Sequence, residues 1–86
     1  MDTRIYNLID SKVNELNEHY GEHAVTVMYE SVCKDWDTTK AWIWMTSFTT
    51  RIPCFVMNAF IPMFQANNII YDLVAKNDRV FIEICF

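Results

Sequence analysis

The hydrophobic spacing of this chain changes at Gly21, the only glycine in its 86 residues. Before Gly21, large apolar side chains recur at the i, i+3, i+4 and i+7 positions of one helix face, with polar residues between them. Asp2 or Thr3 can accept the first free N–H groups of such a helix, and Gly21 can adopt the left-handed conformation that closes one. The sequence therefore predicts an amphipathic helix over residues 3–20. Its apolar face would hold Ile5, Leu8, Ile9, Val13, Leu16 and Tyr20.

After Gly21 the residue types change to those that favour strands. Residues 24–32 and 41–49 are rich in β-branched and aromatic side chains, and the polar stretch 34–40 between them suits a hairpin turn. Residues 79–86 alternate with a period of two, which is typical of a strand with one buried face. We expect this strand to tie the residues up to Phe86 into the sheet.

Residues 52–60 fit two structures. A period of two predicts a third strand, whereas Thr50 as a cap and Pro53 in the first turn would begin a helix. We favour the strand, and we place a second helix from Pro62 to about Asn77 because proline suits a first helical turn. The apolar face of this helix would hold Met63, Ala66, Ile70, Leu73 and Val74.

These segments predict an α+β fold with the order α-β-β-(β)-α-β. Two helices of this length can pack on one face of a mainly antiparallel sheet. A chain of 86 residues lies below the usual domain size of about 100 to 150 residues, so we expect a single domain over residues 1–86.

The charge and hydropathy of the chain exclude two classes of partner. Its formal net charge is −4, whereas direct binding to nucleic acid depends on clustered Lys and Arg. The most apolar stretch, residues 52–64, is interrupted by Pro53, Asn58 and Pro62 and is shorter than the ~20 residues that a membrane span needs. No basic region leads into an apolar run at the amino terminus, so we expect no signal peptide.

The cysteines indicate a reducing compartment. Cys33, Cys54 and Cys85 are odd in number and widely spaced, which matches neither a secreted disulfide framework nor a paired thiolate metal site. We therefore expect a cytoplasmic protein.

Motifs for catalysis or for cofactor binding are weak. A single glycine excludes the glycine-rich loops that cradle phosphates. His19 and His23 have the four-residue spacing of a helical zinc pair, but Gly21 between them favours two solvated side chains. The same histidines could activate Cys33 or Cys54 as a nucleophile, although nothing in the spacing requires contact. We expect no enzyme activity, no metal and no cofactor.

Negative charge gathers in one part of the chain. Between Asn14 and Asp37 six acids stand against a single base, Lys34, so this block carries −5 and the rest of the chain +1. Such asymmetry steers a small domain toward basic surfaces, although an ordinary solvated face gives the same pattern. The acids are Glu15, Glu18, Glu22, Glu30, Asp35 and Asp37.

Tryptophan is concentrated in and beside the first predicted hairpin. In residues 41–49, Trp42, Trp44, Thr46 and Phe48 would point to one side of the strand, and Ala41, Ile43, Met45 and Ser47 to the other. Two helices cover only one of these faces, and an uncovered face rich in Trp is typical of protein interfaces. The alternative is that these rings belong to the core. Trp36, between two aspartates in the predicted turn, is the ring hardest to bury.

These features predict a non-enzymatic acidic protein-binding module, an inhibitor or adaptor that docks on a basic surface of another protein. A nucleic-acid-binding factor has such a surface. The predicted contact residues are Trp36, Asp35, Asp37, Glu15, Glu18, Glu22, Trp42 and Trp44.

Two further hypotheses stay open. A structural subunit could self-associate as a homodimer through an apolar sheet face. Separately, frequent Ile, Asn, Phe and Tyr with scarce Gly are typical of accessory proteins from small AT-rich genomes such as those of phages. A viral protein would then act in the host cytoplasm.

Overall fold

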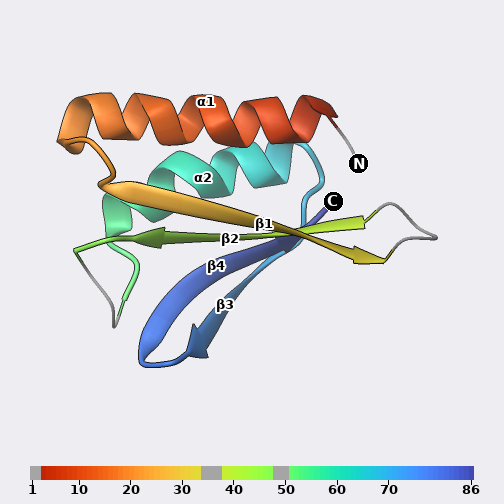
Figure 1. Cartoon of the computed structure of the whole chain (residues 1–86). Helices are drawn as coiled ribbons and strands as arrows, with labels where there is room; N and C mark the ends of the chain where they lie inside the picture. Colours follow the sequence, from red (N-terminus) through yellow and green to blue (C-terminus); the bar gives the residue numbers. More distant parts are fainter. Residues whose placement is uncertain (1–2, 34–37, 48–50) are drawn as a thin grey trace.

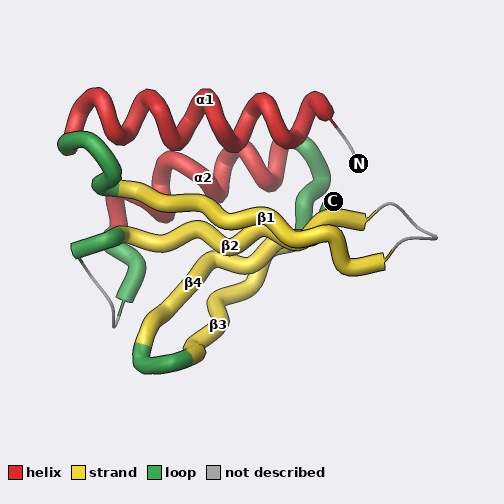
Figure 2. The backbone as a smooth tube through the Cα atoms, in the orientation of Figure 1, coloured by secondary structure: helices red, strands yellow, loops and turns green. Residues whose placement is uncertain are grey.

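Two helices cover one face of a four-stranded antiparallel sheet (Figure 1). The computed structural model describes residues 3–33, 38–47 and 51–86. The sheet has the strand order β1-β2-β4-β3, and Figure 2 shows both helices on the same side of it. The α+β expectation, with helices on one face, is confirmed. The elements are α1 (Thr3–Tyr20), β1 (Val25–Cys33), β2 (Thr38–Met45), α2 (Cys54–Ala66), β3 (Tyr71–Lys76) and β4 (Arg79–Cys85).

The first half of the chain follows the prediction closely. Helix α1 has the predicted bounds, and four of its six predicted apolar residues are buried, with Leu8 partly buried and Tyr20 exposed. Gly21 has a positive φ of 120° and donates its N–H to the carbonyl of Asn17 at 2.9 Å, which ends the helix. Strands β1 and β2 form a hairpin as predicted, in register from Val25↔Met45. The bounds predicted for the second strand, 41–49, are wrong, because β2 begins at Thr38, inside the predicted turn 34–40, and ends at Met45.

Residues 52–60 are not the strand that we favoured, because α2 begins at Cys54. The helix forms in place of the strand because of the position of Asn58. A strand would place Asn58 on the same face as Val56 and Phe60, whereas a helix turns it to the opposite side. Val56 and Phe60 are fully buried and Asn58 is exposed, as the helical period requires. Pro53 is the N-cap residue and makes no side-chain cap.

The predicted helix from Pro62 to Asn77 is also wrong. Pro62 lies inside α2 on its exposed side, and the helix ends at Ala66. Asn68 then takes a left-handed conformation with a φ of 56°, and Ile69 donates its N–H to the carbonyl of Phe64 at 2.8 Å. This closure is of the Schellman type, with asparagine in the place of glycine.

A strand, β3, replaces the second half of that predicted helix. Asn77 and Asp78 both have positive φ, 53° and 61°, so they form a two-residue turn that joins β3 to β4. The element order is therefore α-β-β-α-β-β. The predicted apolar helix face does not form: Ile70 is 86% exposed and Leu73 is 51% exposed.

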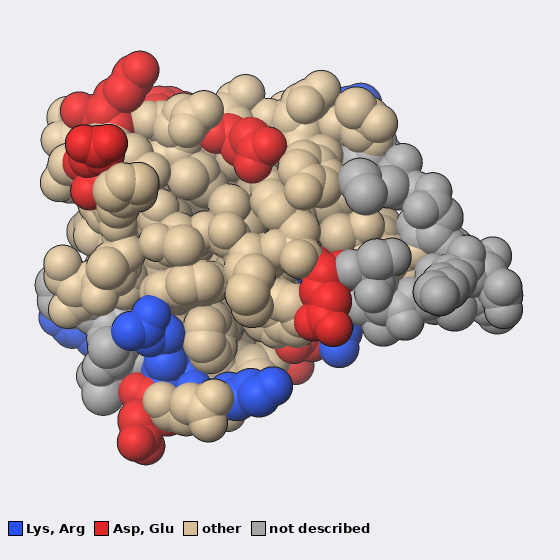
Figure 3. Space-filling model, in the orientation of Figure 1, with Lys and Arg blue, Asp and Glu red and all other residues tan. Residues whose placement is uncertain are grey.

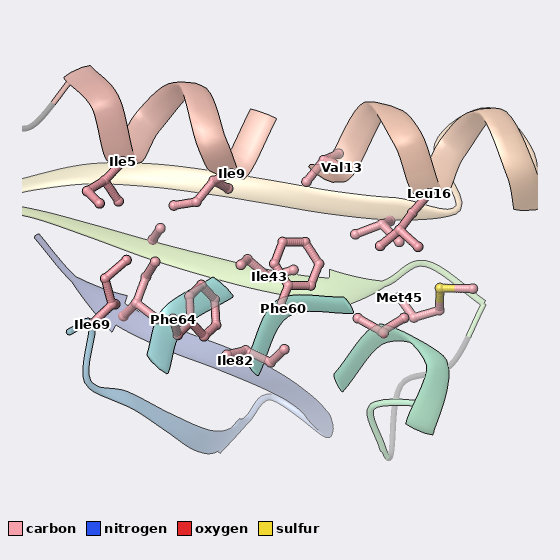
Figure 4. Packing of buried hydrophobic residues seen from close by; sticks show 14 residues of the cluster. Ile5, Ile9, Val13, Leu16, Ile43, Met45, Phe60, Phe64, Ile69 and Ile82 are labelled. Carbon is pink, nitrogen blue, oxygen red and sulfur yellow. The ribbon is translucent and has the colours of Figure 1, made fainter. Parts of the chain in front are cut away.

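The hydrophobic core lies between the helices and the sheet (Figure 4). Its centre is formed by α2, where the rings of Phe60 and Phe64 stack with centroids 5.8 Å apart. Neither helix within the described residues is long and apolar enough to cross a membrane. The core residues labelled in the figure are Ile5, Ile9, Val13, Leu16, Ile43, Met45, Phe60, Phe64, Ile69 and Ile82.

The residue after β4 is tied into the sheet, as predicted. Phe86 donates its N–H to the carbonyl of Thr39 at 2.9 Å and accepts the N–H of Thr39 at 2.7 Å. Its ring also packs edge-on against Tyr6 of α1, with centroids 6.1 Å apart.

Candidate protein-interaction surfaces

The first candidate surface is the acidic pole, which we define as Glu15, Glu18 and Glu22 at the C-terminal end of α1. Glu15 and Glu18 are three residues apart and share one flank of the helix, and Glu22 lies beyond the helix, where it borders a hollow together with Glu18. The red cluster at the upper left of Figure 3 marks this end of the molecule. The pole thus unites three of the residues that the sequence singled out.

Two adjoining hollows open at the acidic pole. One, of about 470 Å³, is lined by Glu15 and Glu18 together with Tyr20. The other, of about 570 Å³, is lined by Glu18 and Glu22 together with His23. Because Glu18 borders both, its carboxylate stands at the centre of the surface.

Little positive charge neutralises the pole. Lys12 pairs with Glu15 at 3.0 Å, and the Nε2 atom of His23 lies 3.6 Å from Glu22. Both pairs are exposed, and such pairs contribute about 0 to 1 kcal/mol. Most of the negative charge is therefore available to a partner.

The ring of Tyr20 is held in place at the pole. It stacks on Phe55 of α2 with centroids 4.3 Å apart, and His19 meets it edge-on at 4.6 Å. Tyr20 nevertheless remains 47% exposed. A fixed and accessible aromatic ring beside carboxylates suits recognition of a cation, which is attracted to the ring face.

The second candidate surface is the open face of the sheet, the side without helices. Residues paired in register share a face, and the buried partners Ile43 and Ile82 mark the covered side. Side chains of the open face are Thr26, Met28, Glu30, Lys40, Trp42, Trp44, Asp72, Val74, Lys76, Arg79, Phe81, Glu83 and Cys85.

Both tryptophans of this face are already bound within the sheet. Trp42 donates its Nε1–H to Glu83 at 2.9 Å, and Lys40 lies 3.6 Å from the same carboxylate. Trp44 meets Phe81 edge-on with centroids 5.3 Å apart, and the guanidinium of Arg79 lies 5.7 Å from its ring centre. The helices leave this face open, as expected, but the rings are half-buried by their own neighbours.

A smaller hollow of about 190 Å³ lies on the open face. Met28 and Trp42 form its apolar floor with Phe81, and Glu30 and Lys76 stand at its border. Met28 is 50% exposed, which makes it the most accessible large apolar side chain of this face among the described residues. The hollow is thus a candidate binding site for one apolar side chain of a partner.

The predicted contact residues do not form one surface. Glu15, Glu18 and Glu22 gather at the pole beside the start of β1, whereas Trp42 and Trp44 lie on the open face. Trp36, Asp35 and Asp37 lie outside the described residues. The strand ends that flank them, Cys33 and Thr38, are at the opposite end of β1 from the pole.

The remaining acid is separate from the pole, whereas the two histidines border its hollows. Glu30 is apart from the pole, on the open face opposite Lys40. His19 and His23 are exposed, and no three His, Cys, Asp or Glu side chains in the described part of the chain are grouped to hold a metal ion.

The hydrogen bond between Tyr29 and Asp10 is one of the partly buried polar contacts that join α1 to the sheet. Burial raises the pKa of Tyr29 well above its ordinary value, and its hydrogen bond to Asp10 raises that pKa further. The phenol donates to the Asp10 carboxylate at 2.7 Å, and its ring stacks on Tyr6 at 4.0 Å. A phenol held protonated in this way fastens a helix to a strand and is unsuited to acid–base chemistry at neutral pH.

Three residues of these surfaces differ from the predictions. The sequence predicts Tyr20 on the apolar face of α1, and it does not mark Met28 or Phe81 as contact residues. The strand period of two could have identified two of them. Phe81 shares a face with Glu83, and Met28 shares a face with Thr26 and Glu30. Comparison with protein-family models, with curated proteins and with solved structures gave no significant match.

Proposed function

We propose that this chain is a non-enzymatic protein-binding module, an inhibitor or adaptor, whose acidic pole docks on a basic surface of another protein. The observation that supports this most is where the acids lie along α1. The first turn of the helix has no acidic residue, while Glu15 and Glu18 lie toward its C-terminal end. The backbone carbonyls at that end are themselves partly negative, so the arrangement is the reverse of the one that stabilises a helix.

The cost of that arrangement is about 0.3 to 1 kcal/mol for an exposed carboxylate in the last turn of a helix, which is the position of Glu18. A partner that neutralises this charge would remove the cost on binding. Lysine and arginine side chains of such a partner fit the two hollows, where the carboxylates accept charge-assisted hydrogen bonds and Tyr20 offers a ring face. The phosphate-binding groove of a nucleic-acid-binding protein has this basic character.

The proposal is tested by reversing one charge at the pole and one elsewhere. Glu18→Lys changes the residue shared by both hollows, and Glu30→Lys makes the same change on the open face. Each variant is immobilised, proteins retained from the native host are identified, and the affinity for the retained partner is then measured. We expect Glu18→Lys to weaken binding about tenfold or more, and Glu30→Lys to have little effect.

Stability measurements separate loss of binding from loss of folding. Glu18→Lys places a cation at the C-terminal end of α1, so it should keep or slightly raise the free energy of unfolding. Equal retention of partners by Glu18→Lys and by the unchanged protein would remove the basis of the proposal. The contribution of Trp36, Asp35 and Asp37 is tested in the same way with Trp36→Ala and Asp37→Lys.

Self-association through the apolar sheet face is the second candidate. The hollow beside Met28 supports it, while the bonds of Trp42 and Trp44 within their own sheet reduce the apolar area on offer. Trp44→Glu places a charge on this face. If the face is the contact, this change should convert any dimer to a monomer of 10.2 kDa in light scattering.

A further inference from the structure

The two edge strands of the sheet are β1 and β3, and hydrogen bonds show which groups of β1 point outward. Thr39 exchanges both backbone hydrogen bonds with Phe86, so alternate residues of β2 from Thr39 onward face β4. The residues between them face β1, where they pair with Thr26, Met28 and Glu30. The N–H and C=O groups of Val25, Val27 and Tyr29 therefore point away from the sheet.

The first of these outward residues is already capped by a side chain. The amide of Asn17 accepts the N–H of Val25 at 2.8 Å and donates to its carbonyl at 3.2 Å. At this end of β1 the side chain of Asn17 thus makes the two hydrogen bonds that a neighbouring strand would make with Val25. Among the described residues, none bonds the outward backbone groups of Val27 and Tyr29.

The middle of this edge lacks the usual protection against pairing with another chain. Edge strands are commonly blocked by charged side chains, by proline or by bulges. Residues 25–29 contain none of these, and the register shift in β1 comes later, between Ser31 and Cys33. Figure 3 shows an uncharged surface between the acidic pole and the charged β3–β4 hairpin below it.

The other edge is better protected. Strand β3 carries Asp72 and Lys76, and the Asp72 carboxylate accepts the outward N–H of Leu73 at 2.9 Å. The two edges of the sheet are therefore not equivalent, and β1 is the one open to a further strand.

We propose that β1 pairs with β1 of a second copy of the chain, antiparallel about a two-fold axis beside Met28. In this register Val27 and the Tyr29 of the second copy exchange two hydrogen bonds, and the symmetry repeats them. The pairing uses the outward groups of Val27 and Tyr29 and ends where Ser31 of the second copy comes opposite Val25, because Asn17 occupies that position. With this cap in place, a register centred on Val27 would keep only the pair between the two Val27 residues.

The side chains of the open face fit this register. Met28 lies beside Trp42 in one row of the sheet, so two Met28 side chains would meet across the axis and cover each other. Thr26 would lie opposite Glu30 of the second copy, which avoids a like-charge pair. Because the strands are antiparallel, the two acidic poles would lie at opposite ends of the dimer, whereas parallel pairing would bring them together.

This edge contact differs from self-association through the sheet face and leaves the acidic pole accessible. It does not depend on the proposed function, because Glu18→Lys should leave the dimer intact while it weakens partner binding. Conversely, variants of β1 should disrupt the dimer and leave the pole unchanged.

The first test compares two matched substitutions. Met28 and Leu73 lie on the two edge strands and are 50% and 51% exposed. Sedimentation velocity from about 1 to about 200 µM should show a concentration-dependent dimer of the unchanged chain. Met28→Lys should raise the dissociation constant about tenfold or more, because it sets like charges opposite each other, and Leu73→Lys should not change it.

Backbone amide exchange tests the register without any substitution. The amides of Val27 and Tyr29 should exchange more slowly as the protein concentration rises, while the amide of Ala75 on β3 should not. A chain that remains at 10.2 kDa over the whole range, with unchanged exchange at Val27 and Tyr29, overturns the proposal. A dimer that survives Met28→Lys but is lost on Trp44→Glu also overturns it, since the contact is then the sheet face.

Crosslinking gives a third measurement in a background where Cys33, Cys54 and Cys85 are replaced by serine. Met28→Cys should form a disulfide between two copies on oxidation, because directly opposite residues have Cβ atoms about 4.5 to 5.5 Å apart. Thr26→Cys should remain unlinked because it would face Glu30. More efficient linkage through Thr26→Cys than through Met28→Cys would exclude this register.

Discussion

The two faces of the sheet use the same strands for different purposes. On β2, Ala41, Ile43 and Met45 face the helices and are buried, while Trp42 and Trp44 between them face outward and are half-exposed. On the covered face, apolar side chains of the sheet pack against apolar side chains of both helices. The open face instead combines ion pairs, a tryptophan hydrogen bond and one accessible methionine. Stability thus depends mainly on one face, and the other is available for recognition.

The difference between the two faces is tested most strongly by the free energy of unfolding of variants at one pair of residues on the covered side, where we expect the largest loss. Ile82 and Leu73 are partners in the register of β4 and β3, but Ile82 is fully buried and Leu73 is half-exposed. Ile82→Ala should lower the free energy of unfolding by about 2 to 5 kcal/mol, and Leu73→Ala by less than about 1 kcal/mol. Urea denaturation measures both. Equal losses would show that the helix layer also shields β3.

A smaller effect is expected on the open face. Trp42→Phe removes the donor to Glu83 and should cost about 1 to 2 kcal/mol, since a half-buried carboxylate loses a partner. Trp44→Phe keeps an aromatic ring against Phe81, removes no hydrogen bond among the described residues of the sheet and should cost less. The difference between the two free energies of unfolding isolates the hydrogen bond. If the variants are equally stable, the open face contributes by packing alone.

At high pH the covered face should weaken through Tyr29. Its pKa is raised in the folded protein, so the stability that it contributes is present below its unfolded pKa of about 10 and is lost as the pH rises above that value. Tyr29→Phe removes this loss, at a cost of about 1 kcal/mol at neutral pH. Thermal unfolding at neutral pH and above pH 10 provides the comparison. An identical pH dependence in the variant would exclude this role for Tyr29.

The smallest change in the free energy of unfolding is expected at the acidic pole, whose side chains are exposed. Glu18→Gln and Glu22→Gln should each raise the free energy of unfolding by a few tenths of a kcal/mol at low salt, about the lower end of helix-dipole effects. The gain should fade as salt rises, because both side chains are exposed. A loss of stability in either variant would mean that the pole is part of the structural framework.

Helices and strands whose ends carry a capping or turn signal could be predicted from the sequence. Segments whose apolar spacing fits both a helix and a strand could not. Helix α1 has both ends marked, and its apolar spacing agrees with only one structure. In residues 54–66 the strand and helix periods both place Val56 and Phe60 on one face, so only the position of Asn58 distinguishes them. For β3, the helical spacing of Leu73 and Val74 outweighed the stronger local signal, the Asn77–Asp78 turn.

The candidate surfaces were predictable only in part. The charge of the pole was visible in the spacing of Glu15 and Glu18, since positions three apart share a helix flank. The place of Glu22 was not, because it lies beyond the helix, after Gly21. The unequal edges of the sheet were not, because strand order depends on pairings between distant segments. Nothing near Val25 in the sequence indicates that Asn17 would cap it, although only eight residues separate them.

The packing of Phe86 against Tyr6 and the pairing of Phe86 with Thr39 bring the first turn of α1 beside the residue that follows β4. In Figure 1 the start of α1 lies near the labelled C end. A short linker could therefore join them, and new ends could open between Asn77 and Asp78, where the turn is exposed. Such a circular permutant would keep every strand pairing while reversing the order in which α1 and β4 are synthesised.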